Sequence, residues 1–159
     1  MPEPVVTESL PAMIDHRHIG YASPPFTAPV ERGRLKFFAK AIGETDPVYT
    51  DLAAARAAGH PDLPVPPTFF FCLEMDRPEP YGWFDDLGID LPKVLHGAQD
   101  FRYHRLAYAG DELRFDSRVT DIYDKKGGQL EFVVQDNRIS NQRGELVAEF
   151  IRTLVIRHG

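Results

Sequence analysis

The chain has 159 residues, of which 43% are hydrophobic and 26% are charged, and its formal net charge is -6 at pH 7. This length suits one domain with its own core, and the composition excludes a disordered or fibrous protein. Because no block of lysine and arginine offsets the acidic balance, we do not expect a general nucleic-acid-binding protein. A local basic patch for a phosphorylated ligand remains open.

The start of the chain and its single cysteine limit further the class of protein that we expect. The first ten residues lack an apolar core, so no secretory signal is predicted, and no apolar run has the length of a membrane span. Cys72 is expected to be a small buried side chain rather than a catalytic thiol. We therefore expect a cytoplasmic protein without membrane contact. No cofactor is predicted, and no metal site, because no His, Asp and Glu residues have ligand spacing.

A helix is predicted early in the chain, after a flexible lead-in of residues 1–12 and a short extended stretch at residues 19–26. Pro29 and Glu31 suit the first turn of a helix, where a missing N–H costs little and an acid is favoured by the dipole. Apolar residues then recur at helical spacing up to Gly43, which is a stop signal. All residues from 13 to 159 are assigned to one domain.

Two further helices are expected before the middle of the chain. The alanine-rich residues 52–58 follow a turn at Asp46-Pro47, and alanine has the highest intrinsic helix propensity. Four prolines between residues 60 and 68 then exclude regular structure. The next helix, residues 69–75, is apolar on nearly all sides and is therefore expected to be buried. Residues 81–92 are expected to form a long loop.

The second half of the chain is predicted to be an antiparallel sheet, because apolar and polar residues alternate with a period of two. Strands are expected over residues 94–104, 113–119, 130–134 and 146–156, joined in part by turns that are rich in glycine and polar residues. The predicted fold class is α+β, with a curved sheet packed on a buried helix. That plan alone does not determine a function.

Three stretches resemble the MaoC-like dehydratase family in its N-terminal-type, or FAS1-like dehydratase, form. Residues 38–51 (FAKAIGETDPVYTD) resemble the hydratase segment of that family. The Ala-Gly at 58–59 and residues 64–69 (PVPPTF) look like the entry into its central helix. LHGAQ at 95–99 and YHRLAYAGDEL at 103–113 look like the N-terminal-type subfamily. The resemblance spans about residues 17 to 157.

The resemblance implies a hotdog fold, in which an antiparallel sheet wraps around a central apolar helix. It also implies a site for thioesters of CoA or acyl carrier protein. Catalytic family members hydrate trans-2-enoyl thioesters, or run the reverse dehydration, with the motif Asp-x-Asn-Pro-x-His. The Asp and the His of this motif act as acid and base, because water must lose a proton as it adds to C3 and a proton must reach C2. The developing enolate oxygen needs N–H donors, which a helix N-terminus can supply.

The chain departs from this motif at its catalytic positions. Glu44 stands at the family's Asp, Asp46 at its Asn and Tyr49 at its His. Glutamate keeps an acid on a longer arm, but tyrosine, with an unperturbed pKa of about 10, is no base near neutral pH. Pro67-Thr68 replaces the His-Gly that opens the central helix, and proline has no N–H to donate. We therefore expect a poor hydratase when this chain acts alone.

The family also implies a partner. Many of its members are double hotdogs, as one polypeptide or as two subunits, in which one half carries the catalytic pair and the other helps to form the acyl pocket. The chain is thus expected to be the substrate-binding subunit of an (R)-specific enoyl-thioester hydratase or 3-hydroxyacyl-thioester dehydratase in fatty acid metabolism. It would pair with a catalytic hotdog subunit or form a homodimer.

The residues of the altered motif each have a functional and a structural interpretation. Glu44 is either a residual acid or base, or a solvated loop acid. Asp46 either contacts the substrate or braces its turn. Tyr49 either donates a hydrogen bond to the thioester or fills the space of the histidine. Thr68 either offers its N–H to the substrate or caps the buried helix, as Asp51 is expected to cap the alanine-rich one.

The remaining candidates for substrate binding lie later in the chain. Trp83 either closes over an acyl chain or covers the core or a dimer contact. His96, followed by Gly97, suits a loop near the ligand, and its alternative role is a hydrogen bond to a loop carbonyl. His104 and Arg105 follow a strand, and they either face a CoA phosphate or an interface, or lie on the surface without a function.

Two other function classes stay open. The first is an enzyme acting alone, either a hydratase that uses Glu44 in changed geometry or a hotdog thioesterase. A thioesterase needs an acid beside the buried helix, and Glu74 and Asp76 lie only at the far end of that helix. The second is a non-catalytic module that binds acyl-CoA. Turnover by the single chain favours the first class, and binding without hydration under any pairing favours the second.

Overall fold

The structure, a computed structural model, describes residues 12–159, so the predicted lead-in lies almost wholly outside the described residues. One antiparallel five-stranded sheet has the strand order β1-β3-β4-β5-β2. The strands are β1 (Phe26–Pro29), β2 (Val94–Tyr103), β3 (Glu112–Lys125), β4 (Leu130–Ser140) and β5 (Leu146–Arg157). The helices are α1 (Arg32–Ala41), α2 (Leu52–Ala57), α3 (Phe69–Glu74) and α4 (Gly82–Leu87), with 3-10 turns η1 (His16–His18), η2 (Pro47–Tyr49) and η3 (Leu91–Lys93).

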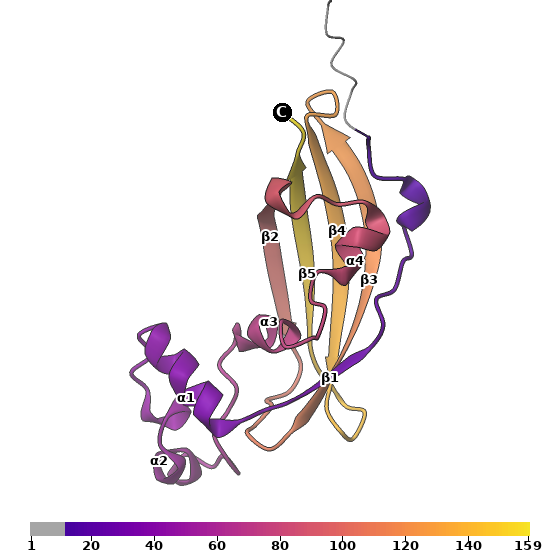
Figure 1. The fold of residues 1–159 in the computed structure, drawn as a ribbon. Coiled ribbons are helices and arrows are strands. Elements are labelled where there is room, and N and C mark those ends of the chain that lie inside the picture. The colour runs from indigo at the N-terminus through magenta and orange to yellow at the C-terminus, as the bar shows by residue number, and fades with distance from the viewer. Residues whose placement is uncertain (1–11) are drawn as a thin grey trace, which may run out of the picture.

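The helices occupy two places relative to the sheet (Figure 1). α3 and α4 lie over one face, whereas α1 and α2 lie beyond the end of the sheet at which β2 ends and β3 begins. The predicted α+β class and the hotdog plan are confirmed. No helix in the described part of the chain is long and apolar enough to cross a membrane.

The strand predictions are confirmed in place, but β3 and β4 are longer than expected. β4 continues through Gln135 and Asn137 to Ser140, where the sequence prediction stopped at residue 134. Both side chains point into the protein and are only 1% exposed. Polar residues at inward positions break the apolar alternation on which the prediction rested, so the strand end could not be seen in the sequence.

The prediction that Pro29 and Glu31 lie in the first turn of a helix is wrong. Pro29 ends β1, where it pairs with Glu112 of β3, and Glu31 is the residue before α1. Proline is tolerated in β1 because that strand lies at the edge of the sheet and needs no ladder N–H at every position. The end of the helix is as expected, since Gly43 follows it with a φ of 72°.

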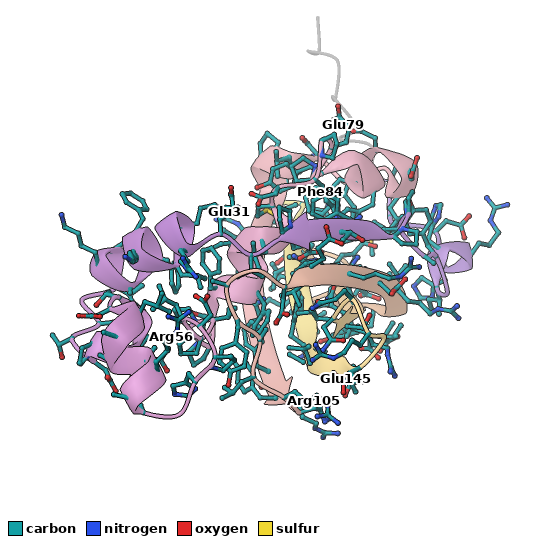
Figure 2. All side chains as sticks on the ribbon, turned by 90° about the horizontal axis from the view of Figure 1, so that it is seen from below. Glu31, Arg56, Glu79, Phe84, Arg105 and Glu145 are labelled. Atoms are coloured by element: carbon teal, nitrogen blue, oxygen red, sulfur yellow. The ribbon has the colours of Figure 1, made fainter. Side chains whose placement is uncertain are left out.

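The helical layer consists of two short helices rather than one long one. α3 ends at Glu74, before the prolines at 78 and 80, and its N-cap residue Thr68 makes no side-chain capping bond. The predicted loop over residues 81–92 is wrong, because α4 occupies residues 82–87. Its side chains Trp83, Phe84 and Leu87 recur at helical spacing and are buried against the sheet. Figure 2 shows Phe84 in this second helix.

Each short helix covers its own part of the core. Phe69, Phe70 and Leu73 of α3 pack with Phe115 and Phe150 of the sheet. The α4 side chains form a second cluster at the other end of the sheet. It includes Val133 near the start of β4 and Leu154 near the end of β5. The core therefore runs along the inner face of the sheet in two blocks.

The α1–α2 segment holds the altered motif beyond the sheet. The Asp51 carboxylate accepts the N–H groups of Ala53 at 2.7 Å and Ala54 at 3.3 Å, so Asp51 caps α2 as predicted. The turn η2 precedes this cap and ends at Tyr49. The packing of α1 and α2 around η2 thus fixes the position of Tyr49.

Candidate functional site

A cavity of about 370 Å³ opens where β2 ends. Three segments form its walls: the turn η2, the residues around the start of α3, and the residues that follow β2. The lining residues are Tyr49, Val65, Pro67, Phe70, Tyr103, His104, Arg105, Leu106 and Ala107. Most of this wall is apolar, with polar groups at a few positions, which is the usual character of a small-molecule site.

The proline-rich segment before α3 forms an extended wall of the cavity. The N–H of Val65 donates to the carbonyl of Ala107 at 2.9 Å. The Tyr103 hydroxyl donates to the carbonyl of Pro67 at 2.8 Å. Proline and the residue before it favour extended backbone, and this is why the four prolines exclude a helix here and yet form an ordered wall.

Tyr49, which the sequence resemblance aligns with the family's His, lines this cavity. Partial burial, together with the nearby carboxylates of Glu44 and Asp46, raises the pKa of Tyr49 above its usual value of 10.0. The hydroxyl therefore keeps its proton at neutral pH. Tyr49 can donate a hydrogen bond to a ligand oxygen there, but it cannot act as a general base.

The two acids of the altered motif are bonded to their own loop. Glu44 Oε1 accepts the N–H groups of Thr45 and Asp46, both at 2.8 Å. The Asp46 carboxylate accepts the N–H of Val48 at 3.0 Å and so starts η2. Neither side chain lines the cavity. Both carboxylates thus brace the loop that carries Tyr49.

His104 and Arg105 form a polar rim on the other side of the cavity. His104 Nε2 lies 2.9 Å from Glu149 Oε2, and Arg105 Nη2 lies 3.8 Å from Glu145 Oε1. Figure 2 shows Arg105 and Glu145 near each other at the edge of the molecule. The Arg105 side chain is 59% exposed, so it remains accessible to an anionic group of a ligand.

The other predicted site residues lie outside this cavity. Thr68 is exposed at the start of α3. Trp83 and His96 line a separate cavity of about 90 Å³ near the other end of α3. Gly97 lies in β2 where the pairing with β5 shifts by one residue, and a Cβ atom there would approach Val155 Cγ2 to 2.8 Å. The structure therefore brings together Tyr49, His104 and Arg105 from the predicted set.

Several lining residues were not singled out in the sequence. These are Val65, Phe70, Tyr103, Leu106 and Ala107. Apolar residues that line a cavity look the same in a sequence as residues of the core, so no pattern could separate them. Tyr103 was placed only as a residue of the predicted strand, and its ring stacks on that of Phe101 in β2.

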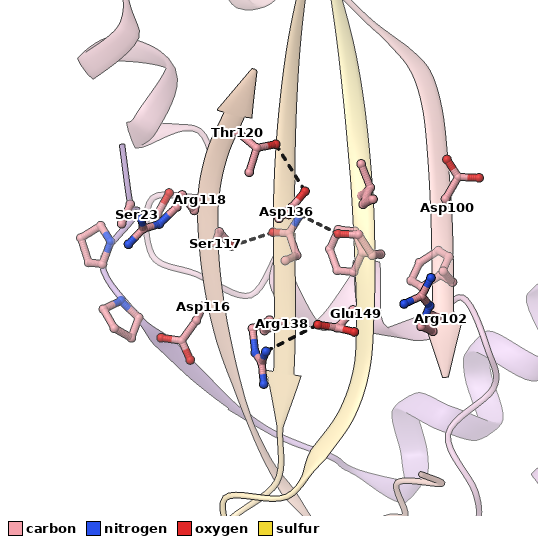
Figure 3. Close-up of a pocket in the computed structure, with 17 residues that line it drawn as sticks. Ser23, Asp100, Arg102, Asp116, Ser117, Arg118, Thr120, Asp136, Arg138 and Glu149 are labelled. Atoms are coloured by element: carbon pink, nitrogen blue, oxygen red, sulfur yellow. Dashed lines mark hydrogen bonds and ion pairs between the residues drawn. The ribbon is translucent and has the colours of Figure 1, made fainter. Parts of the chain in front are cut away.

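A larger hollow, about 880 Å³, lies on the face of the sheet opposite to α3 and α4 (Figure 3). It contains none of the predicted site residues. Its charged side chains alternate in sign and contact one another, as Arg138 does with Glu149 at 3.6 Å. Such mutual pairing is typical of a solvated sheet face, so we assign no function to this hollow. Among the described residues no group of three or more His, Cys, Asp and Glu side chains could hold a metal ion.

The comparison with known families agrees with this geometry. Residues 17–150 match the family described as FAS1-like, dehydratase domain region. The chain belongs to this family. A UPF0336 protein of Saccharopolyspora erythraea is 38% identical to this FAS1-like dehydratase domain over 145 residues, which is 91% of the chain and 92% of the relative.

Solved structures place the domain among the MaoC-like hotdog dehydratases. It is similar to the C-terminally truncated HadBC (3R-hydroxyacyl-ACP dehydratase) complex of Mycobacterium tuberculosis, with a TM-score of 0.72 and 26% identity over 87% of this chain and 96% of that chain. The ChsH1-ChsH2 complex of the same organism gives a TM-score of 0.69 and 29% identity, over 86% and 89%. A MaoC-like dehydratase gives a TM-score of 0.76 and 25% identity, over 89% of this chain and 43% of that chain.

Proposed function

We propose that this chain is the substrate-binding subunit of an (R)-specific enoyl-thioester hydratase, which is a 3-hydroxyacyl-thioester dehydratase in the reverse direction. A second hotdog subunit would supply the catalytic acid and base. The observation that carries the proposal is that Tyr49, which the resemblance aligns with the family's His, lines the cavity and has a raised pKa. No Asp or Glu lines this cavity in the described part of the chain, which supports a partner that brings the family's catalytic acid and base.

In this role the chain binds and orients the thioester. The apolar wall of the cavity receives the acyl chain, and the Tyr49 hydroxyl donates a hydrogen bond to the thioester oxygen, on which negative charge develops. The partner's base takes a proton from water while the water oxygen bonds to C3, and the partner's acid gives a proton to C2. In this role Tyr49 takes no proton from water, because partial burial and the nearby acids raise its pKa.

The free edge of the sheet supports a partner. β2 is an edge strand of ten residues, and Leu95 and Tyr103 within it are 50% and 46% exposed. A long edge strand with unpaired backbone groups is a template for pairing with another chain. Because the residues directly after β2 line the cavity, a partner strand along β2 would lie beside the site. The partner is either a catalytic subunit or a second copy of this chain, which are the two pairings expected from the sequence.

The proposal keeps the narrower expectations of the sequence: one hotdog domain over residues 13–159, CoA or carrier-protein thioesters as ligands, and a cytoplasmic role in fatty acid metabolism.

One observation favours a second candidate, an enzyme that acts alone. His104 lines the cavity and is paired with Glu149 at 2.9 Å, the arrangement of a base and its orienting acid. If this pair catalyses hydration, His104→Gln abolishes turnover by the single chain.

The experiment that tests thioester binding uses two arginines that share one acid. Arg105 and Arg143 both contact Glu145, but only Arg105 lines the cavity. We expect Arg105→Ala to weaken acyl-CoA binding about fivefold in isothermal titration, because one charge-assisted contact to a phosphate is lost. The matched Arg143→Ala variant should bind as the wild type does. Equal affinities of all three proteins, or no binding by the wild type, would contradict the proposal.

A further inference from the structure

A row of polar residues, fully buried except for the partly buried Gln99, crosses the inner face of the sheet under the end of α3. Gln99 of β2 pairs with Arg152 of β5, and Arg152 pairs with Gln135 of β4. Arg152 and Glu74 of α3 are 4% and 3% exposed, and Arg152 Nη2 lies 3.1 Å from Glu74 Oε1. The same Nη2 donates to Gln135 Oε1. Because apolar replacements of buried ion pairs are often neutral or stabilising, stability alone gives no reason for this row.

Three atoms of this row have unmet hydrogen-bonding capacity. Among the described residues, Arg152 Nε, Gln99 Nε2 and Glu74 Oε2 are buried and have no hydrogen-bond partner. Leaving such an atom unpaired costs about 1–3 kcal/mol, so native proteins rarely do it without a ligand or water. Of the three residues only Arg152 lines a cavity, and its Nε–H is a donor that a hydroxyl oxygen can accept from.

The guanidinium of Arg152 lines the small cavity that also contains Trp83 and His96. It lies 6.0 Å from the ring centre of Trp83 and 5.8 Å from that of Phe71. The volume, about 90 Å³, is below the roughly 150 Å³ of a cavity that accepts benzene. The cavity therefore suits a group of about four or five non-hydrogen atoms, and its walls are largely aromatic.

The charges around the cavity select among polar ligands. Glu74 neutralises Arg152, so the pair carries no net charge for an anion to balance. A neutral hydroxyl can accept from the unpaired Nε–H of Arg152, and its apolar part contacts the rings of Phe71 and Trp83, which line the same cavity.

We propose that this cavity is a second binding subsite, which takes an apolar group that ends in a hydroxyl. The hydroxyl belongs either to a small free alcohol or to the far end of an acyl chain held in the first cavity. Phe70 lines the first cavity and Phe71 the second, so consecutive residues of α3 separate them. Only the acyl-chain source rests on the proposed function.

The test follows two groups of the cavity in the full chain by NMR: the Arg152 Nε–H and the indole of Trp83, the one tryptophan of the sequence. The probes are butan-1-ol and butane-1-thiol, which have similar shape but different hydrogen-bonding strength. We expect both signals to shift with the alcohol, with a Kd in the millimolar range, and about fivefold weaker binding of the thiol. Unshifted signals, or equal affinities, would mean that the row holds ordered water only and would overturn the proposal.

Two variants separate the hydrogen bond from the fold. Arg152→Lys keeps a positive charge beside Glu74 but removes the Nε–H, so the preference for alcohol over thiol should vanish while the thiol still binds. The paired change Arg152→Met with Glu74→Met removes both charges and should stay folded. It should also lose the preference. If either variant keeps the full preference for the alcohol, Arg152 does not hold the hydroxyl.

A second arm identifies the source of the hydroxyl. Pairs of plain and ω-hydroxy acyl-CoA thioesters of about six to twelve carbons are compared by isothermal titration. Tighter binding of one ω-hydroxy member, lost in Arg152→Lys, assigns the subsite to the acyl chain. If butan-1-ol binds selectively and the pairs do not differ, the ligand is a free alcohol. If no acyl-CoA binds at all, the proposed function fails, and the alcohol titration still decides the subsite.

Discussion

The Tyr103 hydroxyl donates a hydrogen bond of 2.8 Å to the carbonyl oxygen of Pro67. This bond joins the edge strand β2 to the residue that precedes the N-cap of α3. Burial raises the pKa of Tyr103 above 10.0, so the hydroxyl remains a donor at neutral pH. The cavity with Tyr49 therefore owes part of its shape to a bond between two of its own walls.

Removing that bond should loosen the site more than the fold. We expect Tyr103→Phe to lower the free energy of unfolding by about 0.5–1.5 kcal/mol, measured by urea denaturation, and to weaken acyl thioester binding severalfold. Tyr123→Phe is the matched control, because Tyr123 stacks on Phe132 away from the cavity. An unchanged affinity of Tyr103→Phe would show that the bond does not shape the site.

The irregularity in β2 requires a residue without a side chain. A Cβ atom at Gly97 would meet Val155 Cγ2 at 2.8 Å and the carbonyl oxygen of Thr153 at 3.1 Å. Gly97→Ala should therefore cost about 1–3 kcal/mol in urea denaturation, because backbone must move. Gly33, inside α1, has open space around it, so Gly33→Ala should stabilise by about 0.5–1 kcal/mol. Equal effects of the two changes would contradict this account of Gly97.

Acid stability should depend on one ion pair near α1. The hydrogen bond from Arg32 lowers the pKa of Asp62 from 3.8 to about 2. A carboxyl with a lowered folded-state pKa stabilises the fold above its unfolded pKa, and this contribution is lost as pH falls through the folded value. The melting temperature of Asp62→Asn should thus lie below that of the wild type at pH 7, and the gap should close between about pH 4 and pH 2.

The matched control for this pH experiment is Asp90→Asn, which alters an exposed acid 3.6 Å from Lys93. Its melting temperature should follow that of the wild type, since exposed pairs contribute little. If the difference in melting temperature between the wild type and Asp62→Asn is the same at pH 7 and pH 2, Asp62 does not account for the loss of stability in acid.

The sequence predicted the sheet well because its strands follow a simple alternation. It failed where an inward position is polar, as at Gln135 and Asn137, or where prolines suggest a loop, as before α4. Trp83 was a candidate for substrate binding in the sequence, but α4 covers less than two turns, which is too short for a periodic signal. Those misses come from tertiary packing, which a local pattern does not contain.

The candidate site was predictable only in part, for a similar reason. The family motif led to Tyr49, and the strand end led to His104 and Arg105, which the fold then brings to one cavity. His96 and Trp83 lie at the other cavity because β2 and the α3–α4 connection place them there. Arg152 and Gln99 gave no signal, since a polar residue in a strand is normally expected to face solvent.

The central claim is that this chain binds the thioester and does not catalyse its hydration alone. The most direct test follows the loss of the enoyl thioester absorbance with purified chain, with a catalytic hotdog subunit, and with both together. We expect no loss with the chain alone and the fastest loss with the pair, slowed by Tyr49→Phe. Rapid hydration by the chain alone that His104→Gln or Glu44→Gln abolishes would contradict the claim.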